Sequence, residues 1–300
     1  MLVLLVIIIS CDDAFDPFGE FNEEYALVCV LRDDTNYQVA VLSTSYPPNE
    51  QGNENHFIEG ADVRVWIGDS VYVFKDTTES SSSGNSLYYY SNNFRVAPNK
   101  MIEIEALLPN GRRLKSISKS PSEIEFLRES STTVPVSNSD LVKLYWELQG
   151  LGNYFLPKLE IKYLYNGEIH YKEVPVRYDN VEGTSLPVYP IASNRNNIIY
   201  NLDAINKTMD LISEGDPDKN SYSVYQSLNF SVIVFDKEVT RYISTTSQTK
   251  IDLTITLNLP DYSNISGGLG VFGSMLIANY ENLIFIPDFV SGFGYKIILN

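Results

Sequence analysis

The segment "LEIKYLYNGEIHYKEVPVRY", residues 159–178, carries the clearest structural signal in the sequence. Two runs rich in aromatic and β-branched residues flank the dipeptide Asn166-Gly167. Asn-Gly between such runs is the strongest short-range signal for a tight antiparallel hairpin. We therefore expect a β-hairpin that turns at Asn166-Gly167, and we expect the surrounding chain to be β as well.

The N-terminal part of the chain repeats this pattern of alternating runs and turn residues. Hairpins are predicted at residues 24–45, 60–76 and 101–118. Residues 77–86, "TTESSSSGNS", are predicted to be a polar low-complexity loop. No helical period stands out before residue 120. Residues 24–120 are therefore expected to form an immunoglobulin-like or transthyretin-like β-sandwich.

A polar stretch with two prolines, residues 121–139, is predicted to be a linker between domains. Residues 140–300 are then expected to form a second β-rich domain with one or two short helices. The helix candidates are residues 201–215 and 237–248. The fold class predicted for the whole chain is mainly β, because parallel βαβ repeats are not found in the sequence.

The composition narrows the classes of partner. The 300 residues carry a net charge of −16, with 44% hydrophobic residues, so a packed core is expected. A protein that neutralises phosphates needs the opposite sign of charge, so nucleic acid is not an expected partner.

The N-terminus carries a candidate lipidation site. Residues 1–10, "MLVLLVIIIS", are too short an apolar run to span a bilayer and have the length typical of a signal peptide. Cys11 follows at once, as in a bacterial lipobox. We predict that the chain is cut before Cys11 and that Cys11 carries acyl chains that anchor the protein to a membrane. The alternative is a buried N-terminal strand that ends in a core cysteine.

Residues 11–23 read as a short solvated tether, because they hold several carboxylates and no Lys or Arg. The acidic residues that follow Cys11 are Asp12, Asp13, Asp16, Glu20, Glu23 and Glu24. An acidic run behind a lipidated cysteine resembles the surface-export signal of Bacteroidota lipoproteins. Cys29, in the apolar run "YALVCVL", is expected to be an inert core thiol.

Several short motifs together resemble a known family. These are "IEGADVRVW" (58–66), "LPNGRRL" (108–114), "LYWELQGLGNYF" (144–155) and "YSNISGGLGVFGS" (262–274). With the lipobox and the acidic tether, they resemble the Bacteroidota outer-membrane lipoproteins known as domain of unknown function 4249. The resemblance implies a lipid-anchored protein of the outer membrane and cell surface, with a TonB-dependent receptor as a partner. It implies no catalytic residue.

The last motif contains Gly267, Gly268, Gly270 and Gly273, and residues 268–273 fit G-x-G-x-x-G. A dinucleotide site needs this motif between a strand and a helix of a βαβ unit, which the sequence does not predict here. We expect these glycines to allow close approach of strands, with Phe272 in the core, and we expect no cofactor.

Other site signals are weak. The two histidines, His56 and His170, lie outside any zinc-binding spacing, so no metal site is expected. Residues 216–220, "DPDKN", resemble half of a calcium loop but fit a solvated turn better. The run Tyr88-Tyr89-Tyr90 offers possible ligand contacts by stacking.

Three functional hypotheses follow. The main one is a non-enzymatic accessory or interaction subunit on a lipid anchor. The alternatives are a surface module that binds glycans or peptides, and a surface hydrolase.

Overall fold

The computed structural model describes residues 24–45, 56–81, 84–148, 152–245 and 262–299. The predicted signal peptide, Cys11 and the tether at 11–23 lie outside the described residues. The N-terminal half contains β1 (Tyr25–Arg32), β2 (Gln38–Thr44), β3 (Asp62–Ile67), β4 (Ser70–Val73), β5 (Lys75–Ser81), β6 (Gly84–Ser91), β7 (Met101–Leu107) and β8 (Arg113–Lys119).

The remaining chain supplies the C-terminal half and one strand of the N-terminal half. Its elements are β9 (Ile124–Phe126), β10 (Thr133–Val134), β11 (Leu141–Leu148), β12 (Phe155–Tyr165), β13 (Glu168–Glu173), β14 (Arg177–Val181), β15 (Thr184–Val188), β16 (Asn197–Asn201), α1 (Leu202–Asp210), η1 (Lys219–Ser221), β17 (Tyr222–Tyr225), β18 (Asn229–Phe235), α2 (Lys237–Thr245), β19 (Leu269–Tyr280), β20 (Ile284–Phe285), α3 (Pro287–Gly292) and β21 (Lys296–Ile298).

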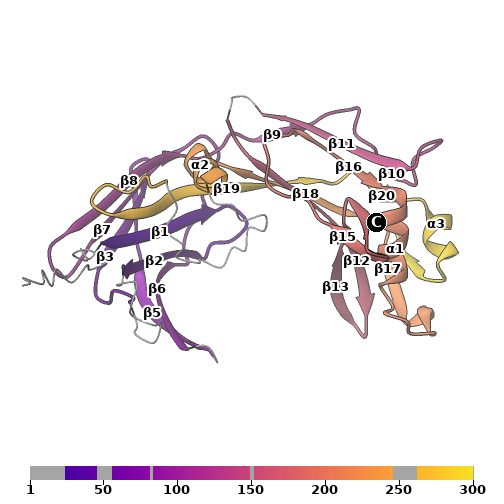
Figure 1. The fold of residues 1–300 in the computed structure, drawn as a ribbon, viewed down its shortest axis with the longest axis horizontal. Helices are drawn as coiled ribbons and strands as arrows, with labels where there is room; N and C mark the ends of the chain where they lie inside the picture. The colour runs from indigo at the N-terminus through magenta and orange to yellow at the C-terminus, as the bar shows by residue number, and fades with distance from the viewer. Residues whose placement is uncertain (1–23, 46–55, 82–83, 149–151, 246–261, 300) are drawn as a thin grey trace, which may run out of the picture.

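One long sheet runs through both halves and gives the molecule the shape of an arch (Figure 1). Its strand order is β21-β17-β12-β18-β19-β1-β2-β6-β5, and β13 pairs with β12 beside this path. A second layer covers each half. In the N-terminal half it is the four-stranded sheet β4-β3-β7-β8, and in the C-terminal half it includes the three-stranded sheet β16-β11-β9. The prediction of a mainly β, sandwich-like fold is confirmed.

β19 joins the two halves. Phe272 and Leu276 on this strand lie in the N-terminal core, whereas Tyr280 lies in the C-terminal core. β19 also pairs in parallel with β1, with Cys29 opposite Phe272. The structure therefore differs from the predicted division at residues 120–140, because a strand from the last forty residues completes the N-terminal sandwich. A parallel partner so distant in the sequence leaves no local signal.

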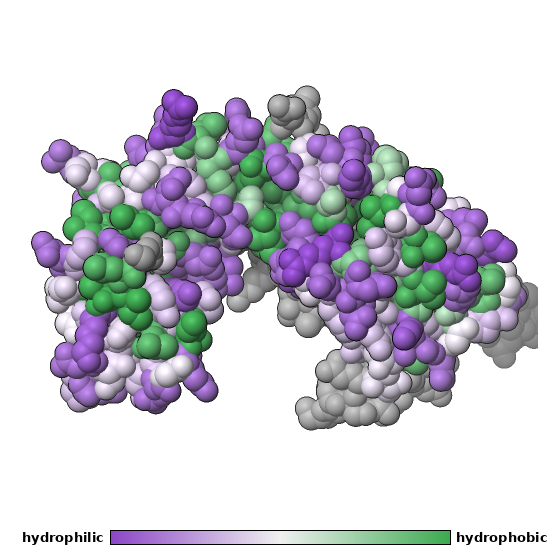
Figure 2. Space-filling model, turned by 180° about the vertical axis from the view of Figure 1, so that it is seen from behind, coloured by the Kyte–Doolittle hydropathy of each residue, from purple (hydrophilic) through white to green (hydrophobic). Residues whose placement is uncertain are grey.

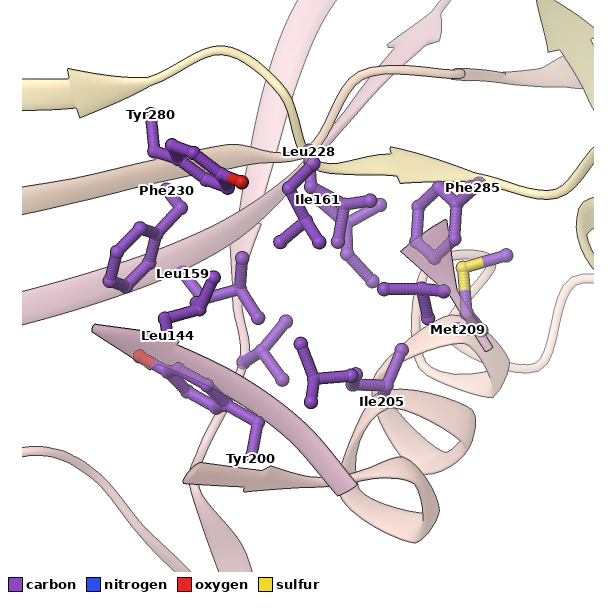
Figure 3. Close-up of a cluster of buried hydrophobic side chains, with 14 of the residues drawn as sticks. Leu144, Leu159, Ile161, Tyr200, Ile205, Met209, Leu228, Phe230, Tyr280 and Phe285 are labelled. Atoms are coloured by element: carbon purple, nitrogen blue, oxygen red, sulfur yellow. The ribbon is translucent and has the colours of Figure 1, made fainter. Parts of the chain in front are cut away.

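The C-terminal core is an apolar cluster between β12, β18, β11, β16 and α1. Figure 3 shows side chains from these elements pointing toward one another, with Ile205 and Met209 contributed by α1. Leu144 and Leu159 are completely buried there. Alternate residues of β11, namely Val142, Leu144 and Trp146, are buried in this core.

The four predicted hairpins are confirmed as β1–β2, β3–β4, β7–β8 and β12–β13. Asn166 and Gly167 both have positive φ, 53° and 82°, as the two-residue turn between β12 and β13 requires. The two helix candidates are confirmed as α1 and α2, and a third short helix, α3, was not predicted.

Two predictions were wrong. The expected loop at 77–86 is the hairpin of β5 and β6, with Thr77 opposite Tyr88. β5 lies at the edge of the sheet, where polar side chains can face water, so its composition hid a strand. The expected linker at 121–139 contains β9 and β10, whose residues Ile124 and Val134 are buried in the C-terminal core.

Candidate interaction surface

The described chain begins at one end of the N-terminal sandwich, beside the turn between β7 and β8. Asn110 Nδ2 in this turn donates a hydrogen bond of 2.8 Å to the phenol oxygen of Tyr25. The Arg112 guanidinium lies 4.9 Å from the centre of the Tyr25 ring, and Arg112 Nε donates to the carbonyl of Gly267. The start of β1 is thus held against the β7–β8 turn.

The glycine motif lies at the same end and packs backbone against backbone. A Cβ atom on Gly268 would lie 2.3 Å from the carbonyl oxygen of Tyr25, and one on Gly270 would lie 2.1 Å from that of Leu27. A Cβ atom on Gly267 would lie 2.4 Å from the carbonyl oxygen of Arg113. The glycines therefore let β19 approach β1 and β8, and Phe272 between them is completely buried.

Gly273 faces a buried carboxylate that the sequence reading missed. A Cβ atom on Gly273 would lie 2.7 Å from either carboxylate oxygen of Asp236. Asp236 Oδ1 accepts hydrogen bonds from the amides of Glu238 and Val239, so it caps α2. Asp236 Oδ2 accepts from the Ser274 amide at 2.6 Å, the Ser274 hydroxyl at 3.1 Å and the Ser118 hydroxyl at 2.8 Å.

Asp236 therefore ties α2 to β19 and β8 through one carboxylate. Burial raises the pKa of its carboxyl to about 6, and the hydrogen bonds from Val239, Ser118 and Ser274 act in the opposite direction. An aspartate at the end of an apolar strand and just before a helix is an N-cap signal, so the sequence could have suggested its position. Its contacts with Ser118 and Ser274 depend on the tertiary fold.

The three tyrosines of β6 separate into two environments. The hydroxyl of Tyr89 donates to the carbonyl of Ile58 and accepts from the amide of Ala61, and the side chain is completely buried. Tyr89 is therefore a core residue and is removed from the possible ligand contacts. Tyr88 and Tyr90 are partly exposed, and both contact Tyr37. The Tyr37 hydroxyl lies 3.2 Å from the Tyr88 hydroxyl, and the rings of Tyr37 and Tyr90 stack.

A further exposed surface lies on the outer side of the four-stranded sheet. We call it the open sheet face. Val71 and Val73 of β4, Met101 of β7 and Ile117 of β8 are 50%, 53%, 53% and 57% exposed. Trp66 of β3 pairs with Val71 and is partly exposed beside them. Large apolar side chains gathered on a sheet face are typical of an interaction site. Figure 2 shows the arch from behind, with hydrophobic patches on both halves.

The charges of the open sheet face are largely paired. Glu105 forms ion pairs with Arg113 at 2.8 Å and with Lys115 at 2.6 Å. Arg64 forms an ion pair of 2.6 Å with Asp62. Exposed Glu103 and Lys119 have no ion-pair partner within the described residues. Strand alternation could have placed Trp66 and Ile117 on the solvent side, because their neighbours on that side are charged.

A shallow pocket lies on the C-terminal half at the start of α1. Its volume is about 350 Å³, and its lining residues are Asp140, Leu141, Asn201, Leu202, Asp203 and Asn206. Asn201 precedes α1 but makes no side-chain capping bond. Asp203 pairs with Lys207 at 3.2 Å. The pocket thus presents carboxylate acceptors beside carboxamide groups, which both donate and accept.

The remaining predicted signals lie in ordinary structural settings. His170 is partly buried, and its ring stacks on that of Tyr163 with the ring centres 5.3 Å apart. Asp218 of the "DPDKN" turn accepts from the Ser221 hydroxyl and donates its amide to Asp216. Among the described residues, no group of three or more His, Cys, Asp or Glu side chains is arranged to hold a metal ion.

Cys29 is completely buried, and burial raises the pKa of its thiol, as an inert core cysteine requires. Across the described ranges, none of the helices has the length and hydropathy needed to cross a membrane.

Comparison with protein-family models finds a match over residues 16–281 to a family described as "Domain of unknown function (DUF4249)". The match confirms the resemblance drawn from the short motifs at the level of the domain. It ends directly after β19, so it includes the strand that both halves share. No curated protein matches the chain.

Proposed function

We propose that this chain, which belongs to the DUF4249 family, is a lipid-anchored outer-membrane protein of the cell surface. In this proposal it acts as a non-enzymatic accessory or interaction subunit, with a TonB-dependent receptor as its partner and Bacteroidota as its source. One observation carries the proposal: Cys11 follows an apolar run and precedes an acidic stretch that ends where the folded body begins.

The position of β1 supports an anchored arrangement. The chain between Cys11 and Tyr25 is about 14 residues long and spans at most about 50 Å. It enters the body beside the β7–β8 turn, at the outer end of the N-terminal half. A lipid on Cys11 would therefore keep that end of the N-terminal half within about 50 Å of the membrane.

Replacing Cys11 by Ser is expected to abolish lipidation, because the thiol is the only atom of that residue that accepts the diacylglycerol group. The measurement is metabolic labelling of cells with an alkyne-tagged fatty acid, followed by fractionation. We expect the unchanged chain to be labelled and membrane-bound, and Cys11→Ser to be unlabelled and soluble. Cys29→Ala is the matched control and should keep the label, since Cys29 is buried. An unlabelled, soluble wild-type chain would refute the anchor.

The partner part of the proposal needs a separate experiment. Purification from native membranes in mild detergent, with a C-terminal tag that leaves Cys11 free, is expected to recover a TonB-dependent receptor in stoichiometric amount. Recovery of the lipidated chain alone would contradict the accessory role while leaving the anchor intact.

The pocket at the start of α1 favours a second candidate function, a surface module that binds glycans. Asp140 and Asp203 offer acceptors, and Asn201 and Asn206 offer both donors and acceptors. Sugar hydroxyls need both kinds of partner. Two carboxylates in the pocket disfavour an anionic ligand, and the nearby positive end of α1 disfavours a bare cation.

For this second function, Asn206→Ala is expected to weaken glycan binding about five- to tenfold, because the side chain's hydrogen bonds to a ligand in this shallow pocket contribute about 1–1.5 kcal/mol. The measurement is a neutral-glycan array, followed by calorimetry on each hit. Tyr88→Ala is the comparison variant on the other half and should leave binding unchanged. Binding lost in Tyr88→Ala and retained in Asn206→Ala would place the ligand on β6.

A further inference from the structure

We propose that the open sheet face mediates association of two copies of this chain through their N-terminal halves. The face is the outer side of β4, β3, β7 and β8, centred on Trp66 and bordered by Val71, Val73, Met101 and Ile117. This inference goes beyond the proposed function and does not depend on the lipid anchor.

The apolar part of the face has the composition of an interface centre. Val71 lies directly opposite Trp66 in the β3–β4 ladder, and Ile117 lies across β7 from Trp66 with Glu103 between them. Tryptophan is enriched among the residues that carry most of the energy of protein interfaces. Water around these exposed side chains is released when a second apolar surface covers them.

The charges of the face favour a second copy over a strongly charged partner. The protein has a net charge of −16, yet the four cationic and three anionic side chains on or beside this face nearly balance. Those side chains are Arg64, Arg113, Lys115, Lys119, Asp62, Glu103 and Glu105. The ion pairs of Glu105 and Asp62 are already formed within one copy.

The two charges without an ion-pair partner in the described residues are Glu103 and Lys119, of opposite sign. Two copies together supply two of each, so these two unpaired charges cancel between the copies, and each face as a whole carries a net charge of only +1. A strongly acidic or basic partner would leave one of the two kinds uncompensated. The face therefore suits a second copy, which carries the same mixture of positive and negative side chains.

The size of the face sets the expected strength. Four strands about 4.8 Å apart and about 20 Å long, with side-chain relief, offer roughly 600 Å² per copy. A total of about 1,200 Å² is at the lower limit of specific interfaces, so we expect a weak and reversible dimer. Repulsion between two bodies of charge −16 opposes association, and salt screens it. The dimer should therefore become stronger, not weaker, as salt rises from about 20 to 300 mM.

The test is analytical ultracentrifugation of the chain from residue 11 onward with Cys11→Ser, over about 1–200 µM protein. This form keeps every described residue and needs no detergent. We expect a reversible monomer–dimer equilibrium. The double variant Val71→Asp/Ile117→Asp should be monomeric throughout, because it places four new carboxylates in the interface. Both side chains are exposed, so the variant should keep the wild-type melting temperature.

The matched control is Ile169→Asp/Tyr171→Asp on β13, whose side chains are 50% and 52% exposed on the other half. It adds the same charge and should dimerise like the wild type. A wild-type chain that stays monomeric at 200 µM would overturn the proposal, as would equal loss of dimer in both variants. Neither result bears on Cys11 labelling. A monomer whose Val71→Asp/Ile117→Asp variant loses a co-purifying membrane protein would assign the face to that protein instead.

Discussion

Gly270→Ala is expected to destabilise the fold by about 4 kcal/mol or more, which is at the extreme end of single substitutions. Gly270 has a φ of +114°, and its missing Cβ would lie 2.1 Å from the Leu27 carbonyl oxygen and 2.9 Å from the carbonyl carbon. A side chain could be accepted only if β19 moved away from β1. That movement would break the parallel pairing between the two strands, on which the N-terminal core depends.

Gly167→Ala separates the two contributions at Gly270, which are the strain of a positive φ and the overlap of a new Cβ atom with the neighbouring backbone. Gly167 also has a positive φ, +82°, but nothing lies within 4 Å of its Cβ position. Its substitution should cost about 1–2 kcal/mol, the strain of a left-handed conformation alone. The measurement is urea unfolding of both variants. Equal losses of unfolding free energy in the two would show that the backbone contact at Gly270 relaxes without cost.

The same experiment reports how strongly the halves are coupled. The chain has two tryptophans, Trp66 in the N-terminal half and Trp146 in the C-terminal core. Replacing one tryptophan or the other by Phe gives two variants that report on one half each. Because β19 belongs to both cores, the fluorescence of these two variants should change at the same urea concentration. Separate transitions would mean that the halves unfold independently despite the shared strand.

The local parts of this fold could be predicted from the sequence, whereas the long-range parts could not. Asn166-Gly167, Gly68-Asp69 and Pro109-Asn110-Gly111 mark turns whose strands follow directly in the chain, and all three hairpins formed. The pairing of β1 with β19 joins residues about 240 positions apart. Nothing in the sequence of either strand indicates the other as its partner. The glycines of β19 indicate only that some other strand packs closely against it.

Polar composition hid strands at two places, for different reasons. β5 is polar because an edge strand needs no apolar face, so its serines and threonines suggested a loop. Residues 121–139 are mostly polar, but Ile124 and Val134 are enough to anchor two short strands in the core. At the site level, alternation places Trp66 and Ile117 on the solvent side. Only the assembled sheet shows that they share one face.

Asp236→Asn is expected to cost about 2–4 kcal/mol at neutral pH, because hydrogen bonds to a charged acceptor contribute about 1.5–3 kcal/mol each and an unsatisfied buried N–H costs about 1–3 kcal/mol. The carboxylate accepts five hydrogen bonds with two oxygens. A carboxamide has one acceptor oxygen, and its NH₂ group must then face either the amide of Ser274 or the amides at the start of α2. At least one buried N–H is left without an acceptor.

The pH dependence of this loss has a defined sign. Burial raises the pKa of the Asp236 carboxyl from its ordinary value of 3.8 to about 6 in the folded state. The unfolded chain therefore releases this proton at lower pH than the folded chain. The contribution of Asp236 to stability is fully present below about pH 4 and is lost as pH rises through 6, by roughly 3 kcal/mol in total.

Asparagine does not titrate, so the variant lacks this pH-dependent contribution to the free energy of unfolding. The difference in unfolding free energy between the wild type and Asp236→Asn should be about 2 kcal/mol larger at pH 4.5 than at pH 7. Urea unfolding at both values measures it, and other titrating groups cancel in the difference. Ser118→Ala is the control: it removes one donor with its hydrogen bond, should cost about 1 kcal/mol, and leaves the carboxylate with four donors. A difference that is larger at pH 7 than at pH 4.5 would mean that the five donors outweigh burial and hold the pKa of Asp236 below its ordinary value.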